Sequence, residues 1–169
     1  WANNLDANGS VDLSPVKITA LNVFEKIADS KAWDVLDKFP NVIDKKGLAK
    51  LRNMDTTINK LAGPYKIVNG LLETPDLSVN VAGGLLKLAG GIKLNQHLDY
   101  KGTLTLERTV LAGFIKDKKL LDVLANQKGK MVLPLIVKGT TTAPIIEPDG
   151  DFLKDRLTSY GSSAVKSLV

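Results

Sequence analysis

Apolar and polar side chains alternate with a period of two residues over much of the second half of the chain. The clearest case is residues 98–106, where the positions between the apolar side chains are polar or charged. Such alternation is typical of a β-strand that buries one face and exposes the other. Residues 77–81 follow the same pattern, and residues 131–137 are also predicted to form a strand. The inward positions of these segments are Leu77, Val79, Val81, Leu98, Tyr100, Leu104, Leu106, Met131, Leu133, Leu135 and Val137.

Glycine and proline pairs divide this region into strands. Residues 54–61 and 65–69 are predicted strands, separated by Gly63-Pro64. Gly83-Gly84 suits a tight hairpin connection into the next strand. Gly90-Gly91 is either a further turn or a bulge that curves the sheet.

The N-terminal part begins with a weak strand pattern and then changes to helical spacing. Residues 8–19 alternate weakly and are interrupted by Pro15, which predicts two short strands or one bent edge strand. Leu21, Phe24 and Ile27 then recur at helical spacing.

A second short helix is expected to follow. Ser30 is a suitable N-cap for it, Trp33 and Leu36 are its apolar side chains, and Pro40 ends it. Residues 46–53 can form one or two further helical turns.

Helical spacing returns after the long strand. Residues 107–126 are predicted to form one or two helices, and the last segment forms a helix from Phe152 onward. Asp149 or Asp151 can cap this last helix from its N-terminal side. Its single apolar stripe consists of Leu153, Leu157, Tyr160, Ala164 and Leu168.

This order of elements predicts an α+β fold, because consecutive strands form hairpins instead of alternating with helices. We expect a mainly antiparallel, curved sheet of about six to eight strands, with N-terminal and C-terminal amphipathic helices packed on it. The chain is predicted to be one domain over residues 1–169. Residues 1–59 would form a helical lead-in with one or two short strands. Residues 60–169 would form the strand meander, a helical insert, a further strand and the closing helix.

Composition and charge narrow the classes of partner. The formal charge is +5, but the basic residues are spread along the chain among nearly as many acids, and pairs such as Lys45-Lys46 are the densest clusters. No aromatic side chains interleave with them, so we expect no nucleic-acid binding. The chain has no cysteine, which excludes disulfides, thiolate metal sites and cysteine catalysis.

The usual chemical motifs are missing from the sequence. His97 is the only histidine, lies in a polar turn, and is interpreted as a surface residue. Neither an HExxH zinc motif nor a GxSxG nucleophile elbow occurs. Asp149 and Asp151 lack the further ligands of a calcium loop, which favours a capping role. We therefore expect a protein that is not an enzyme, with no catalytic residue, no metal site and no cofactor.

Several segments follow one another in an uncommon order. They are Ile67–Leu77 (IVNGLLETPDL), Leu88–Leu94 (LAGGIKL), Leu98-Asp99-Tyr100, Leu133–Thr140 (LPLIVKGT), Ala143-Pro144 and Pro148-Asp149. This set resembles the C-terminal region of the AsmA family of bacterial envelope proteins, over roughly residues 60–169.

The resemblance implies a fragment of a large periplasmic protein that is anchored in the inner membrane of a Gram-negative bacterium. Members of this family are linked with outer-membrane assembly and with the movement of phospholipid between the two membranes. The implied partners are the remainder of the parent protein, phospholipid, and other envelope proteins. The chain begins at Trp1 and ends at Val169 within a helical pattern, which agrees with a segment of a longer protein.

Two functions remain open at this level. The inward strand positions either line an apolar groove that holds lipid, or form the closed core of a structural or protein-interaction module. Burying a Leu or Val side chain stabilises a fold by ~1.5–3 kcal/mol, so these faces must be covered by something. A hydrolase or transferase with an unusual site is a third, weaker hypothesis.

Overall fold

The computed structural model describes residues 6–14, 16–17, 22–32, 34, 41–53, 57–81 and 83–166. Within these residues, eight strands form one antiparallel sheet in the order β1-β3-β4-β5-β6-β7-β8, with β2 also paired to β3. The strands are β1 (Ala7–Leu13), β2 (Val16–Lys17), β3 (Thr57–Val68), β4 (Leu71–Val81), β5 (Gly84–Ile92), β6 (Leu98–Glu107), β7 (Lys130–Gly139) and β8 (Pro144–Pro148). The α+β prediction with a mainly antiparallel sheet is confirmed.

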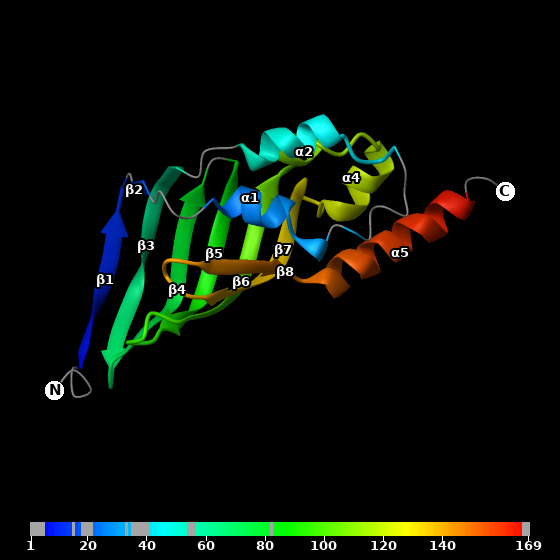
Figure 1. The fold of residues 1–169 in the computed structure, drawn as a ribbon. Coiled ribbons are helices and arrows are strands. Elements are labelled where there is room, and N and C mark those ends of the chain that lie inside the picture. The colour runs from blue at the N-terminus through cyan, green and yellow to red at the C-terminus, as the bar shows by residue number, and fades with distance from the viewer. Residues whose placement is uncertain are drawn as a thin grey trace.

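In the described part of the chain, five α-helices accompany the sheet. They are α1 (Val23–Ala28), α2 (Lys45–Arg52), α3 (Arg108–Ala112), α4 (Lys118–Leu124) and α5 (Gly150–Lys166). They lie on one face of the sheet, here called the inner face, and gather over its β5–β8 side, whereas β1 and β3 extend beyond them (Figure 1). The opposite face is called the outer face.

The N-terminal edge consists of two strands, as one of the two alternatives predicted. β1 and β2 pair with consecutive stretches of β3, in the order Leu13 opposite Leu61 and then Val16 opposite Ile58. Pro15, which was expected to interrupt the edge, lies outside the described residues.

The predicted break at Gly63-Pro64 is wrong, because β3 runs without interruption through both residues. Proline lacks an N–H group, and a central strand tolerates it only where the ladder is already irregular. The register between β3 and β4 shifts between Ala62 and Lys66, so Pro64 lies in such an irregularity. Its other neighbour is Ser10 of β1.

Gly90-Gly91 is not a turn, since both residues lie within β5 and the chain reverses only after Ile92. A bulge does occur nearby, but in the partner strand β4, where the register shifts between Thr74 and Leu77. Gly90 has a φ of +154° and sits between Thr74 and Tyr100, where a Cβ would collide with the backbone of β6. The Thr74 hydroxyl donates a buried hydrogen bond of 3.1 Å to the Tyr100 hydroxyl across this glycine.

β8 was not predicted. It is only five residues long, and Pro144 and Pro148 stand at its two ends, which hid it from the strand criteria. Its three inward residues, Pro144, Ile146 and Pro148, are nevertheless buried against β7.

The predicted helices around Phe24 and Ile27, over residues 107–126 and at the C-terminal end agree with the structure, whereas most of the helix predicted after Ser30 lies outside the described residues. Phe24, Ile27, Leu153 and Leu157 are buried, and residues 107–126 form two helices, α3 and α4. Asp149 is the cap of α5, because its carboxylate accepts hydrogen bonds from the N–H groups of the second and third helical residues. Predicted positions outside the described residues are Leu21, Trp33, Leu36, Pro40 and Leu168, and the Ala164 side chain is likewise not described.

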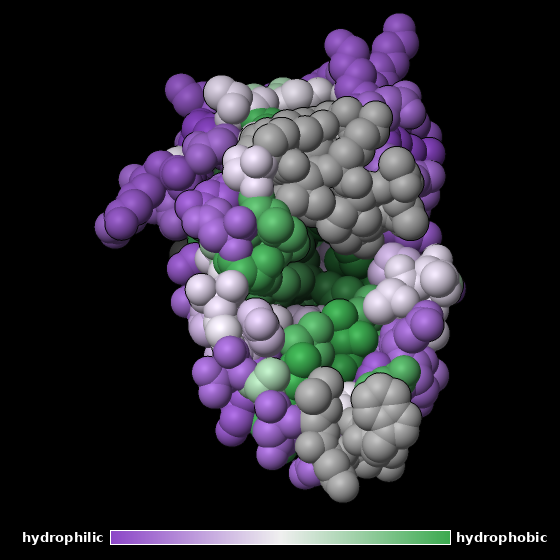
Figure 2. Space-filling model, turned by 90° about the vertical axis from the view of Figure 1, so that its left-hand side faces the viewer, coloured by the Kyte–Doolittle hydropathy of each residue, from purple (hydrophilic) through white to green (hydrophobic). Residues whose placement is uncertain are grey.

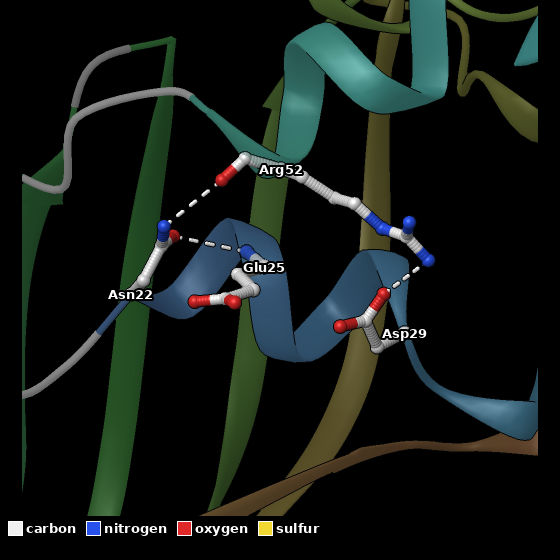
Figure 3. Close-up of polar contacts among 4 residues, drawn as sticks. All are labelled: Asn22, Glu25, Asp29 and Arg52. Carbon is white, nitrogen blue, oxygen red and sulfur yellow. Dashed lines mark hydrogen bonds and ion pairs between the residues drawn. The ribbon is translucent and has the colours of Figure 1, made fainter.

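A polar clamp joins α1 and α2, which lie side by side over the sheet (Figure 3). The Asn22 side chain caps α1 by accepting a hydrogen bond of 2.9 Å from the N–H of Glu25. The same side chain donates a hydrogen bond of 2.9 Å to the carbonyl of Arg52, the last residue of α2. Arg52 in turn pairs with Asp29, the C-cap of α1. Both ends of α1 are therefore tied to the end of α2.

Candidate apolar groove on the inner face

One row of paired residues crosses the sheet on its inner face. Partners in antiparallel strands point to the same face, so this row can be followed from β6 to β1. It runs through Leu104, Leu86, Val79, Leu61 and Leu13. Exposure rises along it: Leu104 is 0% exposed, Val79 5%, and Leu13 49%. In the described part of the chain, the same face is thus a closed core at β6 and becomes more exposed toward β1.

The eleven predicted inward positions fall mostly in the covered part. Nine of them are buried in one hydrophobic cluster. These nine are Val79, Val81, Tyr100, Leu104, Leu106, Met131, Leu133, Leu135 and Val137. The other two, Leu77 and Leu98, are partly exposed and lie beside this cluster.

We call the part of the inner face that contains these nine residues the covered core. Apolar side chains of the helices pack on it. The cluster includes Phe24 and Ile27 of α1, Leu111 of α3, and Leu153 and Leu157 of α5, each at most 1% exposed. Side chains at this level of burial leave no room for a ligand.

The open apolar surface is the part of the inner face next to the covered core, where the described residues bury the apolar side chains only in part. Its residues share that face by register and are only partly buried, or exposed in the case of Leu13. They are Val11, Leu13, Leu61, Tyr65, Ile67, Leu72, Leu77, Leu88, Ile92 and Leu98. Figure 2 looks into the molecule from the β1 end and shows a hollow with a hydrophobic floor, and the described residues around it are largely polar.

Small residues on the inner face let the strands curve around this hollow. Gly9, Gly63, Gly84, Gly90 and Gly102 all occupy inner-face positions in the register. Glycines at such positions permit the bends that a curved sheet needs. The Tyr65 ring lies directly over Gly9, where a Cβ would come within about 2.9 Å of the ring. An aromatic ring of β3 therefore packs on a glycine of the edge strand β1.

Sequence reasoning missed most of the open apolar surface. Its β3 residues, Leu61, Tyr65 and Ile67, do alternate, but the assumed break at Gly63-Pro64 divided them between two strands. The alternation of Val11 and Leu13 was recognised, but nothing in the sequence tied these residues to β3. Assigning one continuous strand through Gly63-Pro64 would have placed Leu61, Tyr65 and Ile67 on the same face.

Among the described residues, no group of three or more His, Asp or Glu side chains could hold a metal ion. His97 is exposed, and its Nδ1 lies 3.3 Å from the carbonyl oxygen of Asn95 in the same turn. Every buried polar side-chain atom in the described part of the chain has a hydrogen-bond partner. Thr74, paired with Tyr100, is the one buried polar residue there.

One titrating group lies in the helix layer. Burial raises the pKa of Tyr160 above its ordinary value of 10.0, and the nearby Asp117 carboxylate, which shares a hydrogen bond with the hydroxyl, raises it further. Asp117 also caps α4 by accepting a hydrogen bond of 2.8 Å from the N–H of Leu120. The pair joins α5 to α4 and has a structural role.

The outer face carries a shallow depression of about 420 Å³ near the β3–β6 turns. Its charged lining residues are Lys66, Glu73, Lys93 and Asp99, so positive and negative groups are mixed. This mixture gives the depression no single charge with which to attract an ion, and the apolar hollow on the inner face remains the better candidate site.

Comparison with protein-family models, curated proteins and solved structures finds no match to this chain. The resemblance to the AsmA family therefore stays a prediction from the sequence. In the described part of the chain, no helix combines the length and the apolar character needed to cross a membrane.

Proposed function

We propose that this domain binds acyl chains of a phospholipid on the open apolar surface and performs no catalysis. The observation that carries the proposal is the row from Leu104 to Leu13, along which a closed core passes into apolar side chains that the described residues cover only in part. Large contiguous apolar patches are uncommon on soluble proteins and mark binding sites when they occur.

The energetics favour an apolar occupant. A Leu side chain gains ~1.5–3 kcal/mol when it is fully removed from water, and partly exposed side chains such as Leu77 and Leu88 have gained only part of this. An acyl chain laid across them would supply the missing cover without needing any hydrogen-bond partner.

The dimensions also suit an acyl chain. The open apolar surface extends over five neighbouring strands, from β1 to β6, which is roughly 19 Å at the usual spacing between strands. The hydrocarbon of one bilayer leaflet is about half of ~30 Å thick. A single chain of that length therefore fits along the surface.

The wider setting of the proposal follows the AsmA resemblance. The domain would be a periplasmic part of a larger protein anchored in the inner membrane, with a role in cell-envelope or outer-membrane biogenesis. Its partners would be the remainder of the parent protein and phospholipid. The net charge of +5 suits contact with anionic headgroups.

A second candidate function is a structural module in which the same surface docks another envelope protein. The tight packing of the covered core favours it, since residues such as Leu104 and Met131 are closed to any ligand. In this case the open apolar surface would be covered by a protein side chain layer instead of a lipid.

Two measurements separate lipid binding from protein docking. The first is native mass spectrometry with lipid extraction of the purified chain, and the second is uptake of phospholipid from vesicles. Leu88→Asp places a charge on the open apolar surface and is expected to abolish uptake. Leu85→Asp is the matched control, because Leu85 lies on the same strand, is likewise partly buried, and points to the outer face. Circular dichroism confirms that both variants are folded.

Lipid bound to the wild-type chain and to Leu85→Asp, but not to Leu88→Asp, supports the acyl-chain proposal. A wild-type chain that neither carries nor takes up lipid contradicts it and favours the docking module.

A further inference from the structure

The two edges of the sheet are built differently. β8 is five residues long, has proline at both ends, and packs against α1. β1 has seven residues without a proline, five of them exposed, and pairs in unbroken register with β3. Natural proteins usually protect sheet edges with short strands, prolines or charges, and β1 has little of this protection.

The backbone of β1 offers hydrogen-bonding groups to a further strand. Ser10 lies opposite Pro64, which has no N–H to donate, and the ladder on the other side of Pro64 is interrupted. Ser10 and Pro64 therefore form a non-hydrogen-bonded pair, and the N–H and C=O of Ser10 point away from β3. By the alternation along a strand, those of Asn8 and Asp12 point the same way. Among the described strands, β3 is the only partner of β1.

The side chains of β1 are complementary to a second copy of β1. In an antiparallel pair centred on Ser10, Val11 faces Gly9 of the other copy and Leu13 faces Ala7. On this inner face Val11 then meets Gly9 together with the Tyr65 ring that lies over it, and Leu13 meets the small side chain of Ala7. On the outer face Asp12 meets Asn8, so the only charge of the strand does not face its own copy.

We infer that two copies of this chain pair through β1 about a twofold axis at Ser10, which joins their sheets into one. An antiparallel pair of identical strands has this symmetry, and the axis keeps both inner faces on the same side. The pairing covers Leu13, which is 49% exposed in the single chain, and joins the two open apolar surfaces end to end. Each surface is incomplete at β1 without the partner copy. The inference does not require that lipid binds there.

Cysteine cross-linking tests the pairing and its register, because the chain contains no cysteine of its own. Two copies of Ser10→Cys would lie opposite each other, with Cα atoms about 5.5 Å apart, within reach of a disulfide. Two copies of Asn8→Cys would be offset by four residues, roughly 14 Å, which is too far. The double variant Asn8→Cys/Asp12→Cys brings unlike positions together and should cross-link again.

Sedimentation of the wild-type chain across a concentration series gives the second measurement. We expect a reversible dimer, a monomer for Ser10→Pro with an unchanged circular dichroism spectrum, and oxidative dimers for Ser10→Cys but not for Asn8→Cys. A wild-type chain that stays monomeric, or equal cross-linking at both positions, would overturn the inference. Both readouts come from the protein alone, so a failure here is distinct from a failure to bind lipid.

Discussion

The covered core and the open apolar surface are two regions of one sheet face, made from the same alternating pattern of aliphatic residues. Leu104 and Leu61 belong to the same row of partners, yet the first is fully buried and the second only partly. The difference lies in the five described helices, which gather over β5–β8, whereas β1 and β3 extend beyond them (Figure 1). Periodicity determines which face is apolar, whereas the placement of distant helices determines what that face does.

Truncating a leucine in each region gives the largest expected contrast. Leu104→Ala should lower the free energy of unfolding by ~2–5 kcal/mol, because it leaves a cavity in a closed core. Leu77→Ala should cost about 1 kcal/mol, since the side chain is partly exposed and leaves no closed cavity. Urea denaturation measures both, and equal losses would show that the two regions are not different.

Removing a tyrosine hydroxyl gives a second contrast. Tyr100→Phe takes away the acceptor of the buried Thr74 hydroxyl and should cost ~1–3 kcal/mol. Tyr65→Phe, on the open apolar surface, should change stability by less than ~0.5 kcal/mol. Thermal unfolding of the two variants is the measurement, and a loss at Tyr65 as large as at Tyr100 would contradict the division.

The polar clamp that holds α1 to α2 should have a smaller effect. Asn22→Ala removes the cap of α1 and the hydrogen bond to α2, and should lower the free energy of unfolding by about 1 kcal/mol. Arg52→Ala breaks an exposed ion pair and should cost less than ~0.5 kcal/mol. If Arg52→Ala proves the more damaging in urea denaturation, the cap is not what holds this helix pair.

The smallest effect concerns pH. Burial and Asp117 raise the pKa of Tyr160 above 10.0, so the folded protein holds this proton more tightly than the unfolded chain. The resulting stabilisation is fully present below the unfolded pKa and is lost as pH rises through the folded one. Between neutral pH and the alkaline range, Tyr160→Phe should therefore lose less stability than the wild type. The measurement is the free energy of unfolding of both proteins as a function of pH. An equal decrease in the two proteins would contradict the raised pKa of Tyr160.

Much of the fold could be predicted from the sequence, because strong local patterns survived in the structure. The strands around 77–81, 98–106 and 131–137 and the cap at Asp149 are where the pattern places them. β8 and the continuous β3 could not be predicted, since both place proline in strands that only tertiary pairing permits. The limit of the helix cover was also hidden, because it depends on contacts such as that of α1 with β8, far apart in the chain.

Photolabelling tests the central claim most directly. A phospholipid that carries a photoreactive group in its acyl chain would be bound to the purified protein, irradiated, and its attachment sites mapped by mass spectrometry. We predict labels on the inner-face residues of β1, β3, β4 and the second half of β5, such as Tyr65 and Leu88. Labels confined to the outer face or the helices, or no labelling at all, would contradict the account.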